Sequence, residues 1–250
     1  MPATVPAHQA AVLPLKLAWP SRFDGVALVV GSTAPDLAYA FLPWWPFGST
    51  HTPLALLWWA LPVTVLLSTV IRRLVLPGAA HLPLRRLRLR DYAACARVRH
   101  RWWTTLSSAL LGAATHIAWD QFTHAGGVVS WLPTLVSPSP FGVPWYKLAQ
   151  YASGVTGTLV TAWCVMLIAK QRLIRRWHGP AEPPAGDPAK WRGTAYAVGA
   201  GLALVAVALP QGTLPHVLTA RWLWAGVLAG VAARWRTRRD WASLTRRSRR

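Results

Sequence analysis

The chain has 250 residues, of which 53% are hydrophobic and only 14% carry a charged side chain. A soluble domain has about 25% charged residues, so this composition excludes an ordinary soluble protein. The formal net charge is +20, a value that fits nucleic-acid binding only if the basic residues form one surface. Their positions along the chain argue against that partner.

The N-terminal part of the chain contains two short apolar arms on either side of a break at Pro20–Asp24. Each arm has about half of the roughly 20 apolar residues that a membrane-spanning helix needs. Two arrangements are therefore open. Either the arms form a re-entrant helical hairpin with His8 and Asp36 at the outer face of the membrane, or a single span covers Val26–Trp45 and leaves His8 in the cytoplasm.

Five further apolar segments approach or reach the length of a membrane span, and nothing in the chain indicates a closed barrel, so we expect them to be helices. They are Pro53–Ile71, Thr104–Phe122, Ala152–Ala169, Thr194–Pro210 and the short Leu218–Ala233. The sequence therefore predicts an all-α, polytopic membrane protein with about five transmembrane helices, plus the N-terminal hairpin or a sixth span.

The basic residues cluster in alternate connections between these spans. The stretches 72–101, 170–192 and 234–250 hold nine, six and eight of the 27 Lys and Arg residues. Cytoplasmic loops carry such an excess, so we expect these stretches inside and the connections 123–151 and 211–221 outside. Anionic lipid headgroups are the expected partners of the basic loops, and nucleic acid is not expected. Arg outnumbers Lys by 23 to 4, which favours a bacterial source and hence the bacterial plasma membrane.

A Pro- and Gly-rich segment divides the chain into parts of different polarity. The expected parts are a membrane domain over 1–178 that holds the His and Asp residues, a linker over 179–190, a two-helix membrane hairpin over 191–233 and a basic cytoplasmic tail over 234–250.

Two of the seven acidic residues, Asp36 and Asp120, fall inside apolar segments. A charge at the centre of a membrane helix costs roughly 2.5–3.5 kcal/mol on insertion scales, so such a residue normally faces a partner. His116, Asp120 and His124 repeat at four-residue spacing, which places all three on one face of a helix. We expect these three side chains to share a bound partner. The alternative is a polar contact that only holds two helices together.

His51 stands at the outer end of its span, and the hairpin arrangement brings His8 and Asp36 to the same layer. Six nitrogen and oxygen ligands then meet there: His8, Asp36, His51, His116, Asp120 and His124. Such a set suits a divalent metal ion, zinc in the first place, with manganese or iron as the other candidates. Six ligands also allow two ions that share a bridging carboxylate.

Five motifs occur along the chain in a fixed order. They are TVPAH at Thr4–His8, GSTAPD at Gly31–Asp36, His51, GAATHIAWDQFTHAGG at Gly112–Gly127 and YKLAQYAS at Tyr146–Ser153. In this order they resemble a bacterial membrane family, domain-of-unknown-function family 4184, over about residues 1–175. The order is also distantly similar to that of membrane-bound metal-dependent hydrolases. The resemblance implies a metal-dependent hydrolase whose site residues are the six ligands named above.

Two kinds of function follow. The first is a metal-dependent hydrolase that cleaves a phosphoester, or another hydrolysable bond, of a lipid-linked substrate at the outer leaflet, with Asp120 or His124 as general base. In that case Lys147, Gln150 and Tyr151 contact an anionic group of the substrate; otherwise they form an interfacial belt. The alternative is a non-catalytic membrane protein, with a metal-binding, transport or assembly role, whose His/Asp cluster is structural.

Overall fold

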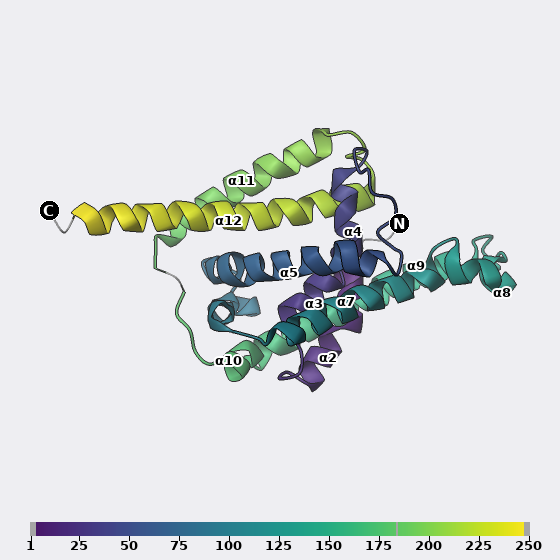
Figure 1. Cartoon of the computed structure of the whole chain (residues 1–250), viewed down its shortest axis with the longest axis horizontal. Coiled ribbons are helices and arrows are strands. Elements are labelled where there is room, and N and C mark those ends of the chain that lie inside the picture. The colour runs from purple at the N-terminus through teal and green to yellow at the C-terminus, as the bar shows by residue number, and fades with distance from the viewer. Residues whose placement is uncertain (1–3, 184, 248–250) are drawn as a thin grey trace. The chain divides into compact units, whose positions relative to one another are not determined.

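The structure is a computed structural model that describes residues 4–183 and 185–247. Over these residues the chain folds into helices joined by turns, with no β-strand (Figure 1). The predicted all-α class is therefore confirmed. The helices divide into two compact units: the first comprises residues 1–39, 44–65 and 101–164, and the second comprises 40–43, 66–100 and 165–250.

The first unit holds the N-terminal helices, a long central helix and most of a second long helix. Its elements are α1 (Thr4–Ala7), η1 (His8–Ala11), α2 (Leu13–Ala18), α3 (Gly25–Gly31), α4 (Ala34–Leu37), η3 (Leu56–Ala60), α7 (Trp102–Thr123), η7 (Gly127–Trp131), α8 (Pro133–Val136) and α9 (Trp145–Lys170). Three elements contribute residues to both units: η2 (Ala38–Phe41), α5 (Leu61–Val70) and α9, whose residues from 165 on belong to the second.

The second unit contains the basic connections and the C-terminal helix pair. Its elements are η4 (Ile71–Val75), α6 (Leu76–Ala79), η5 (Arg85–Leu87), η6 (Leu89–Arg97), α10 (Leu173–His178), α11 (Pro188–Ala208) and α12 (Pro215–Arg247). Helices α11 and α12 lie side by side (Figure 1).

Four helices among the described residues are long and apolar enough to cross a membrane. They are the continuous helix Leu56–Ala79, α9, α11 and the Pro215–Thr237 part of α12. Each corresponds to a predicted span, as a polytopic membrane protein requires. The remaining predicted span, Thr104–Phe122, forms the 22-residue helix α7. It falls outside the four because the Ser, Thr, His and Asp side chains on it lower its hydropathy.

Several helix ends differ from the predicted ones because local signals outside the apolar runs set them. Helix α11 begins at Pro188, where the side chain of Asp187 accepts a hydrogen bond of 2.8 Å from the Ala189 N–H and so caps the first turn. Helix α12 continues to Arg247, well beyond the expected end of its span at Ala233.

Arg221 lies in the second turn of α12, and not in the outer turn where the sequence placed it. Its side chain is 6% exposed. The guanidinium donates hydrogen bonds to five backbone carbonyls of the second unit, those of Ala40, Leu42, Ala206, Leu209 and Pro210. Three of these carbonyls lie at or just after the end of α11, where the helix itself supplies few N–H partners, although the Leu209 carbonyl also accepts from the Gly212 N–H at 2.9 Å. The buried charge thus closes the turn between α11 and α12.

The N-terminal region is the predicted hairpin of two short arms. No single helix covers Val26–Trp45, because α3 ends at Gly31 and α4 and η2 follow as separate short helices. The buried Asp24 caps α3: its Oδ1 accepts from two backbone N–H groups and its Oδ2 accepts from Thr105 on α7 at 2.9 Å. The residues 26–45 therefore do not form one continuous helix, while the topology of this region in a bilayer stays a prediction.

Helix α3 packs directly on α7 because two glycines remove the side chains that would separate them. A Cβ atom at Gly31 would clash with the backbone carbonyl of Ala109, and one at Gly112 would clash with the carbonyl of Leu28. This close approach brings the chain that follows α3, with Asp36 on α4, next to the turn of α7 that carries His116.

Candidate metal centre

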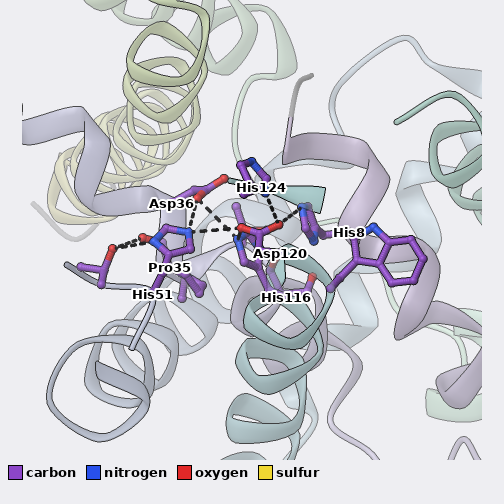
Figure 2. Close-up of polar contacts among 12 residues, drawn as sticks. His8, Pro35, Asp36, His51, His116, Asp120 and His124 are labelled. Atoms are coloured by element: carbon purple, nitrogen blue, oxygen red, sulfur yellow. Dashed lines mark hydrogen bonds and ion pairs between the residues drawn. The ribbon is translucent and has the colours of Figure 1, made fainter. Parts of the chain in front are cut away.

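His116 is the most deeply buried polar side chain of the cluster, with 0% of its surface exposed. Its Nδ1 lies 2.8 Å from the backbone carbonyl oxygen of Ser32. A carbonyl can only accept a hydrogen bond, so Nδ1 carries the proton and Nε2 of the neutral ring carries a lone pair. That buried Nε2 has no hydrogen-bond partner and points toward the carboxylates of Asp36 and Asp120 (Figure 2).

Four residues bring their ligand atoms together at this point: Asp36, His51, His116 and Asp120. All four ligand atoms lie within 4.8 Å of one another. His116 Nε2 is 3.4 Å from Asp36 Oδ1 and 3.3 Å from Asp120 Oδ2, and His51 Nε2 is 3.6 Å from Asp120 Oδ2. Bonds of about 2.0–2.1 Å to a tetrahedral ion place neighbouring ligand atoms roughly 3.3 Å apart. These three separations therefore fit a tetrahedral site.

One pair in this group is closer than a shared ion requires. His51 Nε2 lies 2.8 Å from Asp36 Oδ1, which is the length of a hydrogen bond. An ion between these two atoms would replace the proton that now joins them. The cluster can therefore take a metal ion after a small separation of one histidine and one aspartate, and it could hold such an ion with two nitrogen and two oxygen ligands.

The second oxygen of Asp120 faces the other two predicted ligands. Asp120 Oδ1 lies 3.3 Å from His124 Nδ1 and 3.7 Å from His8 Nε2, and it is buried without a hydrogen-bond partner. The His8 ring stacks on the ring of His116, with 3.9 Å between ring centroids. Each carboxylate oxygen of Asp120 thus faces two imidazole rings, as Figure 2 shows. All six predicted ligands lie in one cluster within the first unit.

Several supporting side chains fix the orientation of the ligands and were not singled out from the sequence. Thr50 donates to the carbonyl of Pro35 at 2.7 Å, which ties the His51 segment to the Asp36 segment. The ring of Tyr39 stacks on His51 with 5.7 Å between centroids. The Ser32 contact comes from its backbone, so the residue type gave no signal. The position of Thr50 beside a predicted ligand was a signal that could have been used.

A cavity of about 320 Å³ opens beside the cluster, and among its lining residues are His8, Asp36, Asp120 and His124. Gln150 from α9 also lines this cavity, and its side-chain nitrogen lies 2.7 Å from His124 Nε2. The other two predicted substrate contacts are placed differently. Lys147 and Tyr151 are exposed and do not line the cavity.

The fold and the cluster together define an all-α protein with helices of membrane-spanning length and a buried group of His and Asp side chains. The chain belongs to the family described as Domain of unknown function (DUF4184), whose model matches residues 1–235. The match confirms the family to which the motifs pointed. No curated protein and no solved structure matches the chain.

Proposed function

We propose that this protein is a multi-pass protein of a bacterial plasma membrane that binds a divalent metal ion, zinc in the first place, and hydrolyses a bond of a lipid-linked substrate. Asp36, His51, His116 and Asp120 hold the ion. The substrate bond is a phosphoester, or another bond that a metal-activated water can cleave. Manganese and iron are the other ions that such nitrogen and oxygen ligands accept.

One observation carries the proposal of a metal. The buried Nε2 of His116 lies 3.4 Å from Asp36 Oδ1 and 3.3 Å from Asp120 Oδ2, and this nitrogen has no hydrogen-bond partner. A neutral imidazole nitrogen that faces two negative oxygens in a buried site is repulsive unless a positive charge lies among them, either a second proton on the ring or a metal ion. A divalent ion supplies that charge and accepts all three groups as ligands. The Nδ1–H bond to the Ser32 carbonyl is the outer contact that orients a metal-binding histidine.

The residues around the cluster can assist hydrolysis. A bound divalent ion lowers the pKa of a water molecule toward neutrality. His124 stands beside Asp120 and lines the cavity, with 30% of its side chain exposed. It can receive the proton of the attacking water and deliver it to the oxygen that leaves phosphorus. Asp120 would orient the His124 ring from its Nδ1 side in this step, and the Gln150 amide, which lies 2.7 Å from His124 Nε2 and donates to it, would give that nitrogen up to the water.

We propose the following orientation for the protein in its membrane. The basic stretches 72–101, 170–192 and 234–250 face the cytoplasm and contact anionic lipid headgroups. The cluster then lies near the outer surface, because α7 ends at Thr123 and His124 follows it at the start of the sparsely charged connection 123–151. Lys147 and Tyr151 would contact the headgroup region from this connection.

The direct test is the metal content of detergent-purified protein, measured by mass spectrometry. We expect about one equivalent of zinc or manganese in the wild type and none in a His116→Ala/Asp120→Ala double variant that elutes at the wild-type position in gel filtration. His178→Ala, outside the cluster, is the matched control and should keep the ion. A wild type without metal, even after metal is added back, would contradict the proposal. Two equivalents would assign His8 and His124 to a second ion bridged by Asp120.

A second candidate function is a structural cluster that holds helices together without catalysis. It is favoured by the 2.8 Å hydrogen bond between His51 and Asp36 and by the stacked rings of His8 and His116, which join four segments in two pairs with no ion. In that case the double variant should fail to fold, and the wild type should contain no metal.

A further inference from the structure

The cavity beside the cluster continues away from it as an apolar groove between η1, α7 and α9. We call it the α7–α9 groove. Its apolar lining includes Ala11, Trp119, Gly154, Gly157 and Val160. Gln150 stands at its polar end, where it contacts His124, and Val160 lies ten residues further along the same helix. At 1.5 Å per residue the groove therefore extends about 15 Å along α9 from the cluster.

Two glycines of α9 shape this groove, one by allowing a close helix approach and one by leaving space. Gly157 allows α1 to pass close to α9, because a Cβ atom there would meet the backbone of Ala7. The hydroxyl of Thr161 donates to the carbonyl of Pro6 at 2.8 Å and fixes the same approach. Gly154 lines the groove beside Ser153 and adds no side chain of its own to it. The result is a narrow apolar channel whose volume of about 320 Å³ lies at the lower end of the range for ligand pockets.

The groove borders a surface of the protein that is itself apolar and exposed. Helix α9 is one of the four helices of membrane-spanning length. Its residues Val155, Leu159 and Trp163 are 63%, 64% and 60% exposed, and Val160, which lines the groove, is 38% exposed. When α9 crosses a membrane, this face contacts the hydrocarbon of the bilayer. The apolar wall of the groove is then continuous with the lipid-facing surface.

We propose that the α7–α9 groove binds one hydrocarbon chain of a membrane lipid and places the headgroup of that lipid at His124 and Gln150. The occupant enters from the bilayer, because the exposed side of the groove is the lipid-facing side of α9. The small volume admits one chain and excludes a pair. This inference rests on the proposed function for the chemistry of the headgroup, and it narrows the substrate class to lipids that present one chain beside the hydrolysable bond.

Photo-crosslinking tests the occupant. The full-length protein is reconstituted into vesicles of phosphatidylethanolamine and phosphatidylglycerol that contain phosphatidylglycerol with a diazirine on one acyl chain. Crosslinked peptides are then mapped by mass spectrometry. In the wild type we expect labels on residues that line the groove, such as Ala11 and Trp119, as well as on the exposed Val155. Labels on Val155 report general contact with lipid and serve as the internal reference.

Variants that fill the groove give the decisive comparison. Val160→Trp and Gly154→Leu should each lower the ratio of groove labels to Val155 labels by about fivefold or more, because the added side chain occupies the space of the acyl chain. Leu159→Trp introduces the same Trp side chain at the neighbouring exposed residue and should leave the ratio unchanged. An equal ratio in all four proteins would overturn the proposal, as would the absence of groove labels in the wild type.

The metal content of the same preparations separates this inference from the proposed function. Neither Val160 nor Gly154 is a ligand, so both variants should retain the metal of the wild type, and this retention also reports that they are folded. Groove labelling in a protein without metal would keep the acyl-chain site and reject the hydrolase. Metal without groove labelling would reject the acyl-chain site and leave the metal site of the proposed function in place.

Discussion

Replacement of Asp120 by Asn separates the charge of this residue from its shape. The two carboxylate oxygens lie 3.3–3.7 Å from nitrogens of His8, His51, His116 and His124. Asn has nearly the same volume, but it carries no charge, and its NH₂ group donates hydrogen bonds and cannot bind a cation. Asp120→Asn should therefore preserve the packing of α7 and abolish the stabilisation that metal provides.

The size of this effect follows from linkage between binding and folding. Zinc at about 100 times its dissociation constant stabilises the folded state by about 2.7 kcal/mol. For a chain of this length 1 kcal/mol shifts Tm by about 2–4 °C. Zinc should thus raise Tm of the wild type by about 5–10 °C. In Asp120→Asn the rise should fall below about 2 °C, because a ligand is lost from the ion.

The assay is a thermal scan of tryptophan fluorescence in detergent, which the 17 Trp residues make sensitive. Protein freed of metal by a chelator is scanned with and without added zinc. Glu182→Gln makes the same change of charge at an exposed position of the 179–190 segment and is the control. The reasoning is refuted if Asp120→Asn shows the same rise as the wild type, or if the wild type shows none.

Two further variants test the packing that the structure assigns to each unit. Gly112→Ala should lower Tm by about 2–12 °C and reduce metal content, since its Cβ would press on the carbonyl of Leu28. A Cβ at Gly226 would meet nothing within 4 Å, so the control Gly226→Ala should not lower Tm. Equal Tm values of the two variants would contradict this packing. Arg221→Met should lower Tm by at least about 5 °C because buried carbonyls lose their donor. The Tm of Arg221→Lys should lie between those of the wild type and Arg221→Met. A wild-type Tm in Arg221→Met would contradict this role of Arg221 and show that water satisfies those carbonyls.

The ligands on α7 could be predicted from the sequence because their spacing is a local property. Residues four apart lie on one face of a helix, so His116 and Asp120 project together from α7, and His124 follows them as the first residue after the helix. The convergence of His8 and Asp36 with them depended on a choice between two topologies. In the structure the two arms form the hairpin. Asp24 caps the first turn of α3, so the second arm begins as a new helix after the break.

Other features depended on contacts between segments far apart in the chain, which no local pattern encodes. The backbone carbonyl of Ser32 orients His116 only because Gly31 and Gly112 let two helices approach. The pattern of apolar residues predicted that Arg221 lies in a turn. In the structure it lies in α12 and is buried, because its guanidinium donates to backbone carbonyls at the end of α11. The mapping of spans succeeded because the requirement for about 20 apolar residues is a property of the segment itself.

The central claim, a metal ion held by histidine nitrogens and aspartate oxygens, is tested most directly by X-ray absorption at the zinc edge of the loaded protein. The account predicts a first shell of nitrogen and oxygen at about 2.0–2.1 Å, with the outer-shell scattering of about two imidazole rings for one ion. The imidazole signal should disappear in a folded His51→Ala/His116→Ala variant. A shell of sulfur at about 2.3 Å, or one of oxygen alone with no imidazole signal, would contradict it.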